Sequence, residues 1–198
     1  MTRHEKMFRH ELADRLDDPE RRVWLPVDDV VRGLDLRAGM VVADIGAGTG
    51  YFARPLARAV APAGEVLAVD LQPQMLERLR GSLTSDLSIR LIQAEATRTT
   101  LDASSVDVVF TANVWHELDD RGAALVEFAR ILRPAGRLAV LDWRTDVSSP
   151  PGPPLEHRVT ASAVVEMLGR AGWSGAAATL VGKYSYLVVA TSRLGRSS

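Results

Sequence analysis

The residues with the clearest chemical meaning form a glycine-rich turn directly after an acidic residue. In the stretch VVADIGAGTGYFARPLARAV, residues 41–60, an apolar run ends at Asp44, and Gly46, Gly48 and Gly50 then alternate before a helical pattern begins. Glycines let backbone N–H groups approach a ligand closely, and the start of the following helix favours a carboxylate or a phosphate. An aspartate adds nothing to a site for an anion alone. A ligand with both an ammonium and a carboxylate would use the acid and the turn together.

A second group of polar residues lies in the segment VDVVFTANVWHEL. Here Asn113 ends a predicted strand, and His116 and Glu117 follow it. A histidine beside a carboxylate is a candidate general base, which a reaction needs only if its substrate must lose a proton. The same two residues could equally form a polar start to the next helix, and the sequence leaves both interpretations open.

The elements that must position these residues alternate between strands and helices. Short β-rich runs, most of them apolar at nearly every position, occupy residues 41–45, 66–70, 89–92, 107–111 and 138–143. Such runs are typical of parallel strands that are buried on both faces. Helical patterns separate them; Pro73 opens one and Asp120 can cap another. The pattern predicts a doubly wound α/β fold with a mostly parallel sheet, whose strand ends hold the polar residues.

The two ends of the chain depart from this alternation. Residues 1–34 read as two or three helical pieces, and we expect them to form a lid or flank on the sheet. Near the other end Thr160 can cap a helix, and two β-like stretches, 176–181 and 184–191, are joined too tightly for anything but a hairpin. We therefore predict seven strands that end in an antiparallel pair, within one domain that comprises the flank 1–34 and a core 35–198.

The string D-x-G-x-G-x-G, from Asp44 to Gly50, resembles motif I of the class I S-adenosylmethionine-dependent methyltransferases. The resemblance extends over roughly residues 40–145. The methionine half of S-adenosylmethionine carries both an ammonium and a carboxylate. The wider chain is similar to a group of small bacterial enzymes related to the ubiquinone and menaquinone C-methyltransferases, through WHEL, LDWR and VGKYSYLVVA. The acceptors in that group are mostly unassigned, so the resemblance implies the cofactor without naming the substrate.

The resemblance also implies roles for individual residues. Asp70, at the end of the second strand, stands where the family's acid accepts hydrogen bonds from both ribose hydroxyls. Glu95 replaces an aspartate that usually lies near the adenine amino group, although an exposed loop acid explains it equally well. Asn113 matches the position beside the cofactor that faces the acceptor. The implied cofactor-binding residues are Asp44, Gly46, Ala47, Gly48, Gly50, Asp70, Leu71, Glu95, Ala96 and Asn113.

The function we expect is methyl transfer from S-adenosyl-L-methionine to a small molecule, with His116 and Glu117 as candidate catalytic residues. The acceptor pocket must come from the residues 1–34, from the region 115–118 and from the proline-rich loop that leads to His157. Trp24, Trp115 and Trp143 either pack in the core or rim, or stack on the acceptor. Two alternatives remain: an NAD-dependent Rossmann oxidoreductase, which the glycine spacing disfavours, and a non-catalytic module that binds S-adenosylmethionine.

Composition excludes several other classes. The 24 basic and 25 acidic residues give a formal net charge of −1, so nothing indicates binding to nucleic acid or to a membrane surface. There is no cysteine, hence no thiolate nucleophile or cysteine zinc site. We expect no metal, because nothing fixes His116, Glu117 and His157 relative to one another. No apolar run could span a bilayer, so we expect a cytoplasmic protein, and the sequence says nothing of its oligomeric state.

Overall fold

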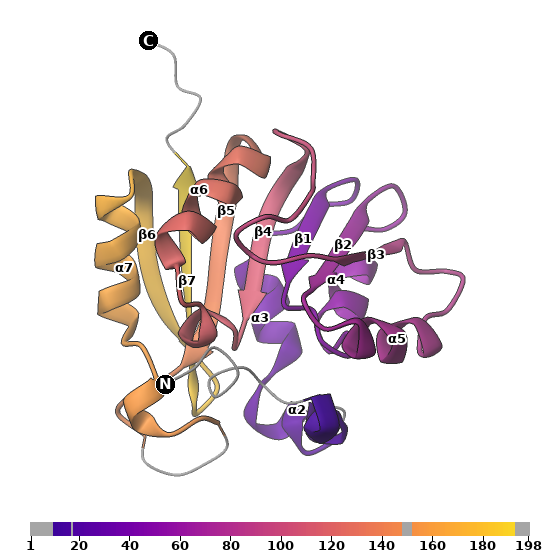
Figure 1. Cartoon of the computed structure of the whole chain (residues 1–198), viewed down its shortest axis with the longest axis horizontal. Coiled ribbons are helices and arrows are strands. Elements are labelled where there is room, and N and C mark those ends of the chain that lie inside the picture. Colours follow the sequence, from indigo (N-terminus) through magenta and orange to yellow (C-terminus); the bar gives the residue numbers. More distant parts are fainter. Residues whose placement is uncertain (1–9, 17, 148–151, 193–198) are drawn as a thin grey trace.

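The fold is a single twisted sheet with helices on both faces, shown in a computed structural model (Figure 1). The structure describes residues 10–16, 18–147 and 152–192. Parts of the predicted flank and of the proline-rich loop, residues 1–9 and 148–151, lie outside this range. None of the described helices is both long and apolar enough to cross a bilayer.

The sheet has seven strands in the order β3-β2-β1-β4-β5-β7-β6, which confirms the predicted doubly wound topology. The parallel strands are β1 (Val41–Ile45), β2 (Glu65–Asp70), β3 (Ile89–Gln93), β4 (Val106–Ala112) and β5 (Leu132–Trp143). β6 (Trp173–Val181) and β7 (Ser185–Ser192) form the predicted antiparallel hairpin, and β7 pairs with β5. The chain leaves β1 toward β2 on one side and returns to β4 on the other. The strand order therefore reverses at β1, where sheets of this kind bind ligands.

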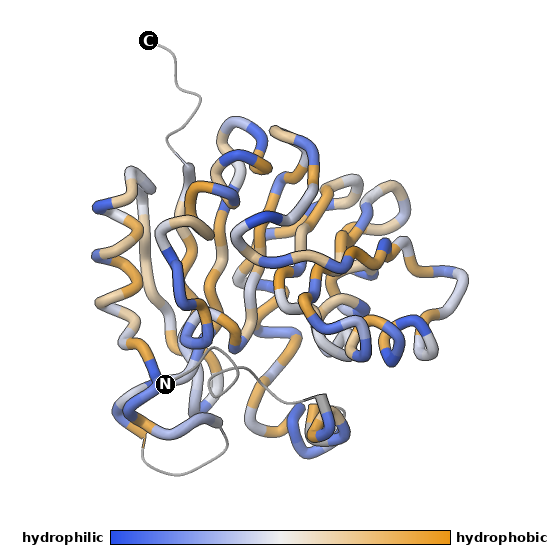
Figure 2. The backbone as a smooth tube through the Cα atoms, viewed as in Figure 1, coloured by the Kyte–Doolittle hydropathy of each residue, from blue (hydrophilic) through white to orange (hydrophobic). Residues whose placement is uncertain are grey.

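Successive strand residues alternate between two hydrophobic cores, one on each face of the sheet. Ala43 and Val109 face the first core, which α6 (Arg121–Ile131) and α7 (Ala161–Arg170) cover. Their neighbours Val42 and Val108 face the second, which α3 (Val27–Gly33), α4 (Ala53–Val60) and α5 (Pro73–Gly81) cover. In Figure 2 the central strands are mainly apolar, and the exposed turns of the helices are polar. This two-sided burial explains why the strands are apolar at nearly every position.

Helix boundaries follow the predicted caps. The Asp120 side chain accepts a hydrogen bond from the Ala123 N–H over 2.8 Å, and Thr160 does the same for Ala163 over 3.1 Å. Two strands begin clearly earlier than predicted: β6 starts at Trp173 and not at Ala176, and β5 starts at Leu132, immediately after α6, and not at Leu138. Leu132 pairs with Val106, and the ladder then shifts register before it resumes at Arg137. The turn signals in this stretch therefore mark an irregularity within the strand.

The amino-terminal flank consists of short pieces, as predicted. They are the 3₁₀ helix η1 (His10–Leu16), the single-turn helix α2 (Arg21–Trp24), and α3. In Figure 1, α2 lies at the end of the sheet toward which β4 points. A further 3₁₀ helix, η3 (Leu155–His157), lies at the same end. The carboxyl ends of the parallel strands are thus covered by segments from the two halves of the chain.

Candidate functional site

A cleft of about 1510 Å³ runs along the carboxyl ends of β1, β2, β4 and β5. Its floor is formed by the residues that end these strands, and its outer wall by η1, α2 and the loop before α7. Almost all of the predicted site residues line it, namely Asp44, Gly46, Ala47, Gly48, Asp70, Leu71, Glu95, Ala96, Asn113, His116 and Glu117. The topology thus brings residues from four separate strands to one ligand-sized space.

Asp44 lies near the end of β1, with a side chain that is almost entirely buried. Burial, with a smaller contribution from the charge of Asp70, raises the pKa of Asp44 to about 7. Among the described residues no donor supplies a hydrogen bond to its carboxylate. A buried carboxylate without a donor is costly, and a cationic ligand group would relieve that cost.

The turn after β1 needs its glycines for two different reasons. Gly46, Gly48 and Gly50 all have positive φ angles, of 75°, 55° and 86°. A Cβ atom on Gly46 would lie 2.3 Å from Val114 Cγ2, whereas one on Gly48 would meet, among the described residues, only Leu16 Cδ1, at 3.6 Å. Gly50 does not line the cleft, and a Cβ there would lie 2.2 Å from Leu79 Cδ1. Gly46 therefore allows Val114 to pack against the turn and Gly50 allows the turn to pack against α5, while Gly48 keeps the cleft floor bare.

Asp70 ends β2 and stabilises the turn from the other side. Its Oδ2 accepts a hydrogen bond from the Gly48 N–H, and its Oδ1 one from the Gln72 N–H, both over 2.8 Å. Burial raises the pKa of Asp70, and these backbone hydrogen bonds counteract part of the rise. The Leu71 backbone also donates to this carboxylate, so of its about four acceptor positions one remains for a ligand.

The loop after β3 places Glu95 and Ala96 at the cleft. The Ala94 N–H donates to the Asp70 carbonyl over 3.1 Å, and the Arg98 N–H donates to the Glu95 carbonyl over 3.0 Å. Asn113, at the end of β4, adopts a left-handed conformation with a φ of 58°. Its buried Oδ1 has no hydrogen-bond partner among the described residues. Strained backbone and an unsatisfied polar atom together are typical of a functional position.

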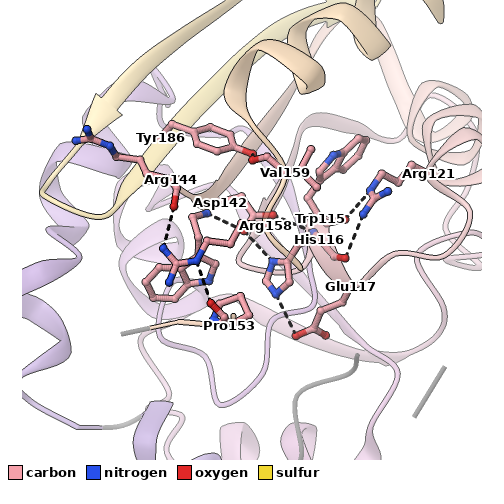
Figure 3. A network of polar contacts seen from close by, with 11 residues as sticks. Trp115, His116, Glu117, Arg121, Asp142, Arg144, Pro153, Arg158, Val159 and Tyr186 are labelled. Carbon is pink, nitrogen blue, oxygen red and sulfur yellow. Dashed lines mark hydrogen bonds and ion pairs between the residues drawn. The ribbon is translucent and has the colours of Figure 1, made fainter. Parts of the chain in front are cut away.

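His116 is held by a buried carboxylate that the sequence analysis did not identify, Asp142 (Figure 3). The His116 Nδ1 lies 2.8 Å from Asp142 Oδ1, and the His116 backbone N–H donates to Asp142 Oδ2 over 2.9 Å. The other ring nitrogen, Nε2, lies 3.8 Å from Glu117 Oε1. Burial by itself would lower the pKa of His116, but the hydrogen bond and charge of Asp142, with the charge of Glu117, outweigh it and raise the pKa.

The surrounding contacts fix this pair. Asp142 is fully buried, and its Oδ1 also accepts a hydrogen bond from the Trp143 N–H over 2.8 Å. Arg121, at the start of α6, donates to the carbonyls of Trp115 and His116 over 2.9 and 3.1 Å. Because Asp142 accepts from Nδ1, the imidazole presents Nε2 on the side of Glu117 and the cleft. This arrangement can take a proton from a molecule bound in the cleft.

Aromatic and apolar side chains form the wall opposite the glycine turn. The rings of Trp24 and Trp143 lie 5.4 Å apart, centroid to centroid, and both residues line the cleft. The Arg158 guanidinium lies over the Trp143 ring at 5.7 Å and donates to the Pro153 carbonyl over 3.0 Å. Trp115 is different, because it is fully buried in the core beneath α6 and does not line the cleft.

Two residues of this region were missed by sequence reasoning. Asp142 stands in the LDWR segment, but an aspartate at the end of a strand does not reveal which side chain it will meet. Arg158 was unassigned, although it donates a hydrogen bond to the loop that carries Pro153.

Within the described residues no three His, Asp or Glu side chains are grouped as a metal site would require.

Comparisons with known proteins find relatives among the methyltransferases. Residues 43–140 match the model of a family described as a methyltransferase domain. A ubiquinone/menaquinone biosynthesis C-methyltransferase of Hahella chejuensis is 36% identical over 111 residues, which are 54% of this chain and 45% of that protein. An uncharacterised methyltransferase of Mycobacterium tuberculosis is 40% identical over 104 residues, 52% of this chain and 40% of the relative. The aligned part therefore spans less than half the length of these curated relatives.

A solved structure is similar over nearly the whole chain. The crystal structure of an S-adenosylmethionine-dependent methyltransferase from Aquifex aeolicus superimposes with a TM-score of 0.88 and 29% identity, covering 93% of this chain and 99% of that one. Fold and site together define the methyltransferase form of the Rossmann-like fold. The chain is similar to the class I S-adenosylmethionine-dependent methyltransferases, among them the ubiquinone and menaquinone C-methyltransferases.

The cofactor of this class is S-adenosyl-L-methionine, and the residues present fit it. Asp44 lacks a donor that the ammonium of the cofactor can supply, and the bare floor at Gly48 leaves room for the cofactor. Asp70 lines the cleft and keeps an acceptor position that a ribose hydroxyl can use.

Proposed function

We propose that this protein methylates a small, flat and largely apolar molecule that carries an ionisable proton. The observation that supports the proposal best is the His116–Asp142 pair at the cleft, opposite the glycine turn and beside the tryptophan wall. One half of the cleft then binds the cofactor, and the other half binds the acceptor. Asp44, Gly46, Gly48, Asp70, Leu71, Glu95, Ala96 and Asn113 bind the cofactor, and the segments that contain Leu12, Leu16, Trp24, Leu118, Trp143 and Pro153 bind the acceptor.

The chain's own residues bind the cofactor, orient the acceptor and remove the acceptor's proton. When bound, S-adenosyl-L-methionine supplies a methyl group on a sulfonium centre, whose leaving group is a neutral thioether. Asp44 neutralises the cofactor's ammonium, and Asp70 fixes its ribose. His116 accepts the acceptor's proton at Nε2, while Asp142 holds the ring and stabilises the imidazolium that forms. Glu117 adds negative potential near Nε2, and the wall formed by Trp24 and Trp143 excludes water from the acceptor.

The 1–34 flank belongs to the same functional unit in this proposal. Leu12, Leu16 and Trp24 line the acceptor side of the cleft, and a Cβ on Gly48 would touch Leu16. In this proposal the flank and the core 35–198 form one domain with one active site.

The experiment is a methyl-transfer screen with methyl-labelled S-adenosyl-L-methionine and four acceptor classes: hydroxyaromatic compounds, enolisable carbonyl compounds, aliphatic amines and thiols. We expect label on one of the first two classes, at a rate that falls in His116→Ala. Equal rates in the wild type and in this variant would contradict the role of His116. Transfer to hydrophilic amines alone would contradict the assignment of the acceptor wall.

A further inference from the structure

A buried acid outside the cleft connects α6 to the loop after β3. Glu127 on α6 is only 8% exposed and does not line the cleft. Its Oε1 accepts hydrogen bonds from the Thr99 backbone N–H over 2.8 Å and from the Thr99 hydroxyl over 2.5 Å. Arg130 donates to the same carboxylate over 2.7 and 2.8 Å, and to the Leu101 carbonyl over 2.7 Å. Glu127 and Arg130 thus form a clamp on residues 99–101.

The clamp determines where the cleft-facing part of the loop lies. At its start the loop is fixed to β2, because the Ala94 N–H donates to the Asp70 carbonyl. At its end Thr99 is fixed to Glu127. Only the turn from Glu95 to Arg98 lies between these anchors, and Glu95 and Ala96 face the cleft from it.

The clamp keeps a full charge in a nearly buried position. The Arg130 hydrogen bonds, with those of Thr99, lower the pKa of Glu127 to about 2 against the opposing effect of burial. Removal of the Glu127 carboxylate would leave the buried N–H and hydroxyl donors of Thr99 unsatisfied. The loop would then lose its second anchor. A loop that is free at one end must be ordered by the ligand, which weakens binding and selectivity.

We propose that Glu127 is a positioning residue for the cofactor: it holds the loop so that Glu95 and Ala96 recognise the adenine ring. This inference rests on the proposed adenine role of the loop. In this proposal Glu127 touches neither cofactor nor acceptor, and it acts only through Thr99. The competing explanation is that the clamp merely stabilises the fold.

The test compares calorimetric affinities for S-adenosylhomocysteine and S-inosylhomocysteine, which lacks the 6-amino group of adenine. The variants are Thr99→Val, which removes one hydroxyl donor from a buried site at nearly constant shape, and Glu127→Gln. We expect the wild type to prefer the adenine ligand about tenfold or more, and each variant to lose a factor of about 3 to 10 of that preference, the range for one or two hydrogen bonds.

Two controls separate positioning from stability. Glu166→Gln removes an exposed ion pair with Arg170 on α7, and Val164→Ala creates a cavity in the core beneath the same helix. Both should keep the wild-type preference, although Val164→Ala lowers the melting temperature. A preference that stays intact in Thr99→Val and Glu127→Gln would overturn the inference about Glu127 alone. A wild type without any preference would overturn the adenine role of Glu95, and the inference with it.

Discussion

The His116 imidazole and the Asp142 carboxylate lie 2.8 Å apart, Nδ1 to Oδ1, at the carboxyl ends of neighbouring strands. The link between the two residues joins the turn after β4 to the end of β5, so it exists only when the sheet is formed. A buried carboxylate in this place fixes both the tautomer and the orientation of the ring.

Loss of the His116 or the Asp142 side chain should slow methyl transfer without weakening the binding of the cofactor. We expect His116→Ala to lower the single-turnover rate by about 10² to 10⁴, and Asp142→Asn by a smaller factor, because the base remains but its orientation does not. Calorimetry with S-adenosylhomocysteine should give nearly unchanged affinities. His157→Ala, at another histidine of the cleft, serves as the control. A destabilised His116→Ala protein with wild-type chemistry would show that the histidine is structural.

The same pair predicts a pH dependence of stability. The pKa of His116 is raised in the folded state, so the stabilisation from the charged pair is complete below the unfolded pKa of 6.5 and is lost as the pH rises through the folded value. The stability difference between the wild type and His116→Ala should therefore be larger at pH 6 than at pH 9. Urea unfolding at both pH values measures it, and a constant difference would argue against the charged pair.

Cofactor affinity should rise as the pH passes through 7, because Asp44 must ionise to bind an ammonium. Its pKa is about 7 in the free protein. Binding of S-adenosylhomocysteine at pH 6.5 should then release a proton, which calorimetry in buffers of different ionisation enthalpy detects. Methylthioadenosine, which lacks the amino acid half, is the control and should release none. Equal proton release by both ligands would remove Asp44 from the ammonium site.

Asp44 should also lower the stability of the free protein. Since its folded pKa is raised from 3.8 to about 7, stability falls as the pH rises between these values. Asp44→Asn removes that loss and should stabilise the free protein at pH 8, by up to about 4 kcal/mol. Thermal unfolding of both proteins at pH 5 and pH 8 tests this, and a variant that is less stable than the wild type at pH 8 would contradict it.

The turn should be sensitive to a single methyl group. Gly46→Ala forces a Cβ to within 2.3 Å of Val114 Cγ2 at a φ of 75°, so we expect stability to fall by about 1 to 3 kcal/mol and cofactor affinity to fall with it. Val114→Ala in the same chain removes the contacts with Cγ1 and Cγ2, and leaves the backbone strain and a tight 3.2 Å contact with the Cβ of residue 114. The double variant should recover part of the lost stability; no recovery would mean that strain alone explains the glycine.

The sequence predicted the sheet well, and most of the residues that it proposed for the cofactor lie at one cleft, since both depend on local patterns. Apolar runs specified the strands, and the glycine turn lies beside the strand that positions it. It did not predict that Leu132 begins β5, because only pairing with Val106 makes that segment extended. Asp142 and Glu127 were missed for a related reason. Their partners, His116 and Thr99, are 26 and 28 residues away, and no local pattern encodes such a contact.

Binding of S-adenosylhomocysteine by the wild type, Asp70→Ala and Glu95→Gln tests the central claim most directly. At one hundred times its dissociation constant the ligand should stabilise the wild type by about 2.7 kcal/mol, and NAD should not stabilise it. Asp70→Ala loses the proposed ribose contacts and the acceptors for Gly48 and Gln72, so its affinity should fall at least about tenfold. Glu95→Gln keeps an acceptor and should weaken binding modestly, while the exposed control Glu77→Gln should change nothing. Stabilisation by NAD alone, or unchanged affinity in Asp70→Ala, would contradict the account.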